Sequence, residues 1–142
     1  MTTYTTQLEA REEIADGTMA FQFRKPNGFE FKPGQAIDVV LSSHRSVTPD
    51  DHSARHAFSI VSAPFQNELV VATRMRDSVF KRALGSLPIG SPVALDGPFG
   101  SLGLHKDRTR AGILIAGGIG ITPFVSDDIR SEEFYGYVSS NR

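Results

Sequence analysis

The chain has 142 residues, of which 39% are hydrophobic and 22% charged, and its 15 basic and 16 acidic side chains give a net charge of -1. This length suits one well-packed domain and is too short for two full domains, since single domains usually run about 100 to 150 residues. The absence of cysteine excludes disulfides, iron-sulfur clusters and thiolate metal sites from the chain. The balanced charge disfavours nucleic acid and membrane partners.

No apolar run approaches the roughly 18 residues needed to cross a bilayer. Segment 1–10 is polar and rich in threonine, without the basic and then apolar order of a secretory signal. We therefore expect a soluble, cytoplasmic protein.

Short alternating runs broken by Gly, Pro and Asn extend from Tyr4 to about Asp96, a pattern typical of an antiparallel barrel or sandwich. A hairpin is expected between residues 19–24 and 29–32, because Asn-Gly between them supplies the positive φ angles of a tight turn. The polar segment 42–54 is typical of a surface loop. The other expected strands are 36–41, 57–62, 68–74 and 92–95.

One helix is expected from Ser78 to about Leu87, because its apolar residues recur at helical spacing. Asp77 is the expected cap, and the proline and glycine after the helix would end it. Further along, the wholly apolar run 111–116 is typical of a buried parallel strand. The elements up to about residue 96 predict a mainly β fold, a barrel capped by a helix.

Segment 55–59, Arg-His-Ala-Phe-Ser, places an aromatic residue beside a hydroxyl. A ring such as Phe58 can stack on a flat π-system and exclude water, while the hydroxyl of Ser59 can hydrogen-bond a polar edge. An ordinary strand with an inward phenylalanine shows the same residues, so this segment alone leaves both interpretations open.

Segment 71–78 joins the end of a strand to the start of the expected helix and carries Arg74, Arg76 and the capping hydroxyl of Ser78. Cationic side chains at a helix N-terminus make an anion site that suits a dinucleotide pyrophosphate. A solvated basic turn before a surface helix is the alternative.

Two glycine-rich segments follow, Gly97-Pro98-Phe99-Gly100 and, about 20 residues later, Gly118-x-Gly120-x-x-Pro123. Glycines of this kind let the backbone approach a nicotinamide or a pyrophosphate closely. Segment 128–134 then alternates charged side chains with isoleucine and phenylalanine, as an edge strand does.

In this order the motifs resemble those of the ferredoxin-NADP reductase family. The resemblance implies a six-stranded antiparallel Greek-key flavin-binding barrel with one capping helix, plus a remnant of an α/β nicotinamide domain. It also implies FAD as cofactor, with FMN as the alternative. We assign no catalytic residue and no metal ligand. The implied cofactor-binding residues are Arg55, His56, Ala57, Phe58, Ser59, Val71, Ala72, Thr73, Met75, Arg76, Asp77, Ser78, Thr122 and Phe134.

One departure from the family pattern concerns the flavin phosphate. The arginine that neutralises this phosphate in the family falls at His56 in this chain, and Arg55 stands one residue earlier, on the opposite face of the strand. A zinc site at His52 and His56 is disfavoured, because a polar loop does not preorganise metal ligands.

The resemblance predicts two parts, a flavin-binding β-barrel domain at 1–108 and a truncated remnant of the NAD(P)-binding domain at 109–142. In the remnant, the first strand and the glycine turn would join the last strand directly, because Ser126 runs straight into Asp127. We expect an internal deletion, engineered in origin. The orphaned strands would pair within one chain or with a second copy, which gives a monomer or a strand-exchanged homodimer.

Three functions are compatible with these residues. The first is a minimal flavoprotein that binds FAD with an exposed isoalloxazine ring. The second is an active NAD(P)H:acceptor oxidoreductase with residual NAD(P)H binding, in which hydride passes to the flavin and electrons pass to a protein or small acceptor. The third is an empty barrel that binds a protein partner.

Overall fold

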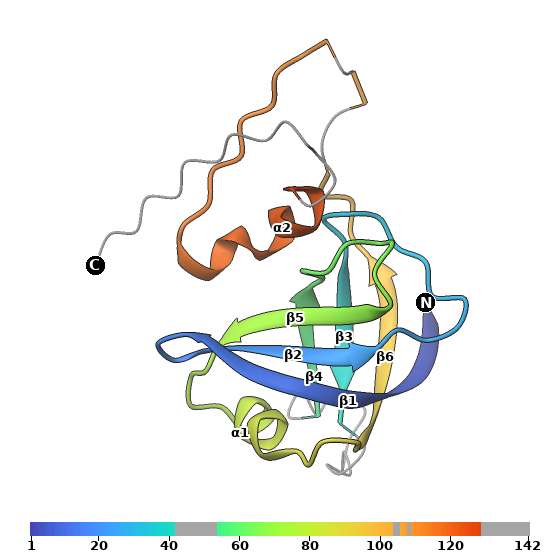
Figure 1. Cartoon of the computed structure of the whole chain (residues 1–142), viewed down its shortest axis with the longest axis vertical. Helices are drawn as coiled ribbons and strands as arrows, with labels where there is room; N and C mark the ends of the chain where they lie inside the picture. Colours follow the sequence, from blue (N-terminus) through green and yellow to red (C-terminus); the bar gives the residue numbers. More distant parts are fainter. Residues whose placement is uncertain (42–53, 104–105, 108, 129–142) are drawn as a thin grey trace.

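The computed structural model describes residues 1–41, 54–103, 106–107 and 109–128. Figure 1 shows a twisted, closed sheet with one helix at its lower end and a second helix beside its upper edge. The elements are β1 (Thr2–Ala15), β2 (Thr18–Arg24), β3 (Ala36–Val40), β4 (Arg55–Ser59), β5 (Glu68–Arg74), α1 (Val79–Ser86), β6 (Pro92–Phe99), the 3-10 helix η1 (Gly118–Ile121) and α2 (Thr122–Asp128). No described helix is long and apolar enough to cross a membrane.

The six described strands form one antiparallel sheet in the order β4-β3-β6-β1-β2-β5. The two edges of the sheet meet just beyond β4, where the Val61 N–H donates to the Val70 carbonyl at 2.8 Å. The Val70 N–H donates in turn to Ser62 Oγ at 3.0 Å. These bonds curl the sheet into a barrel, which confirms the mainly β fold class.

β1 was not expected as a strand from the sequence. Its first half, Thr2–Gln7, pairs with β6, and its second half, from Leu8 onward, pairs with β2. Of its 14 residues only Leu8 is buried. The strand therefore lacks the strong apolar alternation that marks β2 and β5.

The expected hairpin between 19–24 and 29–32 is wrong. β2 pairs with β1 and β5, and residues 29–32 form no strand. The Asn27-Gly28 turn does form, with Gly28 at φ 76° and the Phe29 N–H donating to the Pro26 carbonyl at 3.1 Å. After this turn Phe29 and Phe31 pack into the core from a loop. They are two residues apart, which is also the spacing of inward-facing residues in a strand.

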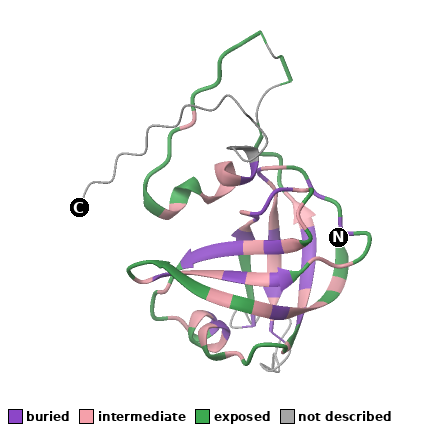
Figure 2. Ribbon diagram, viewed as in Figure 1, coloured by how far each residue is buried: buried purple, intermediate pink, exposed green. Residues whose placement is uncertain are grey.

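The barrel core consists of large apolar side chains from every described strand and from α1. Figure 2 marks the buried positions along the ribbon in purple. α1 closes one end of the barrel by burying Phe80 and Leu84. The helix lies where it was expected, but Ser78 rather than Asp77 caps it, since Ser78 Oγ accepts the Lys81 N–H at 3.2 Å. Among the strands, β4 begins at Arg55, before the expected residue 57, and β6 continues to Phe99.

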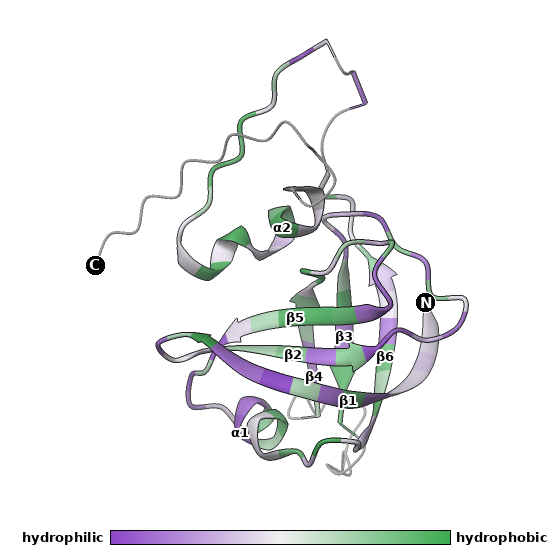
Figure 3. Ribbon diagram, in the orientation of Figure 1, coloured by the Kyte–Doolittle hydropathy of each residue, from purple (hydrophilic) through white to green (hydrophobic). Residues whose placement is uncertain are grey.

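The expected buried strand at 111–116 is wrong as well. This stretch has no regular secondary structure, and Ile113 and Ile115 are each 87% exposed. Figure 3 shows it as a hydrophobic run on the arm that leaves the barrel. A parallel strand is stable only between neighbouring strands with both faces covered, and none of the described strands pairs with it.

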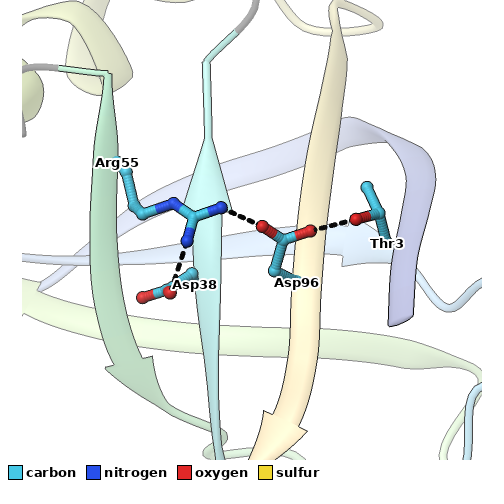
Figure 4. A network of polar contacts seen from close by, with 4 residues as sticks. All are labelled: Thr3, Asp38, Arg55 and Asp96. Atoms are coloured by element: carbon cyan, nitrogen blue, oxygen red, sulfur yellow. Dashed lines mark hydrogen bonds and ion pairs between the residues drawn. The ribbon is translucent and has the colours of Figure 1, made fainter. Parts of the chain in front are cut away.

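A polar network crosses four strands on the outer face of the barrel (Figure 4). Asp38 of β3 and Asp96 of β6 lie directly opposite each other in the sheet, which places two like charges together. The guanidinium of Arg55 in β4 forms ion pairs with both carboxylates, and Thr3 Oγ1 of β1 donates to Asp96 at 2.5 Å. Arg55 therefore stabilises a sheet that would otherwise hold two facing carboxylates.

Replacing Arg55 with Met is expected to lower the free energy of unfolding by about 1 to 3 kcal/mol, because two partly buried carboxylates lose their shared counter-ion. Arg24→Met is the matched control, since it breaks only the Arg24–Glu9 pair, in which the arginine side chain is 62% exposed. We expect the control to cost less than about 1 kcal/mol in urea unfolding. Equal losses in the two variants would contradict this role of Arg55.

Replacing Leu8 with Ala is expected to cost about 2 to 5 kcal/mol in the same assay, because Leu8 is 0% exposed at the point where β1 changes partners. Ile14, on the same strand, is 54% exposed, so Ile14→Ala should change the free energy of unfolding by less than about 0.5 kcal/mol. A mild Leu8→Ala effect would show that β1 does not hold the two halves of the sheet together.

Candidate functional site

A cavity of about 550 Å³ opens where β5 ends, between α1 and η1. In Figure 1 this place lies at the tip of the β5 arrow, with α1 below it and η1 above it. The site thus combines the strand-to-helix connection with the glycine turn, two segments about 40 residues apart in the sequence. Its lining residues are Thr73, Arg74, Arg76, Lys81, Gly117, Gly118 and Ile119.

Three cationic side chains gather in this lining, and none of the lining residues is a carboxylate. Lys81 Nζ donates to the Arg74 carbonyl at 2.7 Å, which holds the lysine against the end of β5. Burial, followed by the charge of Arg76, lowers the pKa of Lys81 from its ordinary value. The contribution of Arg76 reflects a like charge close to Lys81, and with no carboxylate in the lining an anion would be attracted to the cavity.

Backbone geometry adds to the attraction for anions. α1 begins at Val79, two residues before Lys81, and a helix N-terminus carries a partial positive charge. On the other side of the cavity Gly118 adopts φ 54°, a left-handed conformation that glycine tolerates best. A Cβ at Gly118 would lie 3.7 Å from the Arg74 guanidinium, so the glycine brings the backbone close to a cationic group.

Several residues predicted to bind the cofactor lie at or beside the cavity. Thr73 and Arg76 line it, and Ser78 caps the adjoining helix. Asp77 is exposed and forms an ion pair with Arg82. The predicted strand-to-helix segment is therefore brought together around one concave site.

Three other predicted residues, in β5 and just after it, pack within the barrel and do not line the cavity. Val71 and Ala72 are buried in β5, at 0% and 7% exposed. Met75 packs against the core, and its N–H donates to the Gly17 carbonyl at 2.7 Å. These three residues shape the wall behind the site, and their side chains do not line the cavity.

The predicted motif on β4 divides between the two faces of its strand. Arg55 and Ala57 stand opposite Val40 and Asp38 on the outer face, where Arg55 is held by the two aspartates. Ser59 follows on that same face. Arg55 is therefore occupied away from the cavity.

His56 and Phe58 lie on the inner side of β4 and form an aromatic cluster with Phe80 of α1. The His56 ring stacks on Phe80 with centroids 5.5 Å apart, and lies 4.8 Å from the Phe58 ring. Phe58 is only 6% exposed, so its ring packs into the end of the barrel instead of presenting an open face. The cluster packs against the start of α1.

The last two predicted residues lie on the C-terminal side of the glycine turn. Thr122 is half-buried and begins α2, and this helix is anchored to the barrel by Ser126 Oγ, which donates to the Ser62 carbonyl at 2.7 Å. Phe134 lies outside the described residues. The position of Thr122 places the glycine turn and α2 on the same side of the barrel as β5.

Sequence reasoning did not select Arg74, Lys81, Gly117, Gly118 and Ile119 as cofactor-binding residues, although they line the cavity. The two glycines were associated with close backbone approach, and Arg74 was part of the basic segment. Lys81 was missed because its orientation depends on how α1 docks. Its place at the third helical residue, on the polar side of the apolar stripe, is the signal that could have found it.

No protein-family model matches the chain. Among curated proteins, human dual oxidase 2 is 31% identical over 124 residues, which is 81% of this chain and 8% of that protein. The reductase component of propane 2-monooxygenase from Mycolicibacterium smegmatis is 27% identical over 126 residues, covering 85% of this chain and 34% of the relative. The chain therefore spans well under two thirds of either relative.

Among solved structures, the ferredoxin NADP+ reductase of Neisseria gonorrhoeae, determined with bound FAD and NADP, matches with a TM-score of 0.74. The match covers 92% of this chain and 51% of the reductase, at 19% sequence identity. The family resemblance carried by the motifs is thus confirmed at the level of the fold. The chain has the architecture of a ferredoxin-NADP reductase-like FAD-binding domain.

Proposed function

We propose that this chain binds FAD as the flavin-carrying part of a ferredoxin-NADP reductase-like electron-transfer protein. The observation that carries the proposal is the cationic cavity at the junction of β5 and α1, within a barrel whose relatives in fold include a reductase with bound FAD. The bound flavin would accept a hydride and pass on electrons one at a time.

The cavity fits a diphosphate better than a neutral group. Arg74, Arg76 and Lys81 supply three positive charges, and a dinucleotide diphosphate carries two negative charges. Arginine forks and a helix N-terminus are both favourable partners for phosphate oxygens. This charge balance disfavours riboflavin, which has no phosphate, whereas the phosphate monoester of FMN carries close to two negative charges at pH 7 and leaves FMN as the alternative. The likeness in fold to a reductase with bound FAD supports FAD over FMN.

The flavin ring would lie along the seam where β4 and β5 approach each other. Ser59, half-buried at the end of β4, offers a hydroxyl to a polar ring edge. Phe58 is buried on the opposite face of β4, so it would stiffen the strand behind the ring and would not stack on the ring. The chain's residues would thus bind the diphosphate end and one polar edge of the ring.

A second candidate function, oxidation of NAD(P)H, is favoured by the glycine turn. Gly117 and Gly118 face the same cavity as the cationic side chains, and Thr122 begins the helix that follows. Small residues here would let a nicotinamide approach the flavin. We propose residual NAD(P)H binding at this turn, coupled to electron transfer to an acceptor.

We further propose that the nicotinamide-binding part is shortened and that the flavin ring is open to solvent on one face. The supporting observation is that α2 follows the glycine turn at once and the acidic segment 127–133 begins within it. We therefore propose a minimal flavoprotein, engineered in origin, as the sequence analysis predicts.

The visible absorption spectrum of the purified chain tests the function directly. Flavin bands, present on purification or after addition of FAD, are expected. NADPH added without oxygen would leave these bands unchanged in a flavin carrier and would bleach them in an active reductase. A chain that remains colourless and takes up no FAD would refute both candidates.

Replacing Lys81 with Met should weaken FAD binding about 10- to 100-fold, because one charge-assisted contact to the diphosphate is lost. Riboflavin affinity should stay within about twofold, since riboflavin lacks phosphate. Quenching of flavin fluorescence measures both dissociation constants.

Lys32→Met is the matched control, because Lys32 is exposed and does not line the cavity. We expect it to leave both affinities unchanged. Equal effects of the two variants on FAD, or an equal loss of FAD and riboflavin in Lys81→Met, would place the diphosphate elsewhere.

A further inference from the structure

His56 packs against α1, the helix that carries Lys81 of the cavity lining. Its ring stacks on Phe80 at a centroid distance of 5.5 Å and an interplanar angle of 29°, and Phe80 immediately precedes Lys81 in α1. His56 is nonetheless exposed at the end of the barrel, so its ring can exchange protons with water. The histidine thus combines solvent access with proximity to the charge that an anion would neutralise.

The charged groups around His56 have opposite effects on it. Burial, followed by the positive charge of Lys81 on α1, lowers the pKa of His56, while Asp38 on β3 raises it. Asp38 is already engaged by Arg55 on the outer face, and Asp77, which precedes α1, is paired with Arg82. Among the described residues, Lys81 is therefore the positive charge that favours the neutral imidazole.

A dinucleotide diphosphate in the cavity would weaken this repulsion. Its two negative charges would offset most of the positive charge of Arg74, Arg76 and Lys81, so the imidazolium form of His56 would be less disfavoured than in the free protein. We propose that filling the cavity with a dinucleotide diphosphate makes His56 take up a proton, so that cofactor affinity depends on pH through this residue. The proposal rests on the proposed function and adds a regulatory property to the same site.

The sign of the effect follows from linkage. A group whose pKa is higher in the complex than in the free protein strengthens binding at low pH. The gain is complete below the pKa of His56 in the free protein, which lies below the ordinary histidine value of about 6.5, and it disappears above the pKa of the complex. A pKa difference of about one unit would make binding about tenfold tighter at the acidic end of this pH window.

FAD is the suitable probe because its diphosphate diester stays fully ionised across this window. FMN is unsuitable, since its phosphate monoester itself titrates near pH 6. Riboflavin has the same ring and no phosphate, and it is the control ligand. Its affinity should be independent of pH if the diphosphate provides the coupling.

The experiment measures the dissociation constants of FAD and riboflavin between about pH 5.5 and 8.5. Calorimetry in buffers of different ionisation enthalpy then counts the protons taken up on binding. The variants are His56→Gln, which cannot titrate, and His56→Arg, which is always charged. Thermal melts of each variant establish that it is folded.

For the unmodified chain we expect FAD affinity to rise as the pH falls, with net proton uptake, and riboflavin affinity to stay constant. His56→Gln should bind FAD weakly and without pH dependence, and His56→Arg tightly and without pH dependence. A merely structural role would lower the affinities for FAD and riboflavin together in His56→Gln and would not be rescued by arginine.

The inference is overturned if FAD binds the unmodified chain with the same affinity across the window, or if His56→Gln keeps the full pH dependence. Either result would leave flavin binding itself intact. Failure of both FAD and riboflavin to bind would instead refute the proposed function, and the inference with it.

Discussion

The architecture depends on one strand that pairs with two different neighbours. β1 joins β6 along Thr2–Gln7 and β2 from Leu8 onward, with an irregularity just after Leu8. Without it, β4-β3-β6 and β2-β5 would be two separate small sheets. Closure of the barrel, the burial of the core and the position of α1 all follow from this change of partner.

The position of the site follows from the same closure. β5 is an edge strand of the sheet, tied to the end of β4 by only a few hydrogen bonds, and its last residues leave the barrel at the cavity. A ligand in the cavity can therefore reach the backbone at the end of β5 and the N-terminus of α1 together, beside Arg74, Arg76 and Lys81. A cationic site at this junction costs the barrel little, because none of these side chains belongs to the core.

Local sequence patterns predicted the elements whose signals are local. β5 has the predicted bounds and α1 nearly so, because apolar residues there recur at the period of one structure. β1 was missed because its pairing, rather than burial of its own side chains, holds it in the sheet. The strand predicted at 29–32 was wrong because Phe29 and Phe31 enter the core from a loop. In the site, Thr73 and Arg76 were predicted from a contiguous motif. On the outer face of the barrel, by contrast, the facing of Asp38 and Asp96 depends on strand register, which no local pattern encodes.

In the exposed run at 111–116, apolar character does not coincide with burial in the core, although the two usually go together. It is apolar, uncharged and rich in β-branched residues, and Ile113 and Ile115 contribute almost nothing to the packed core. Such segments are the places where one chain adheres to another. The run therefore offers an exposed apolar contact to other molecules without contributing to the packed core, so substitutions within it are expected to change self-association more than stability.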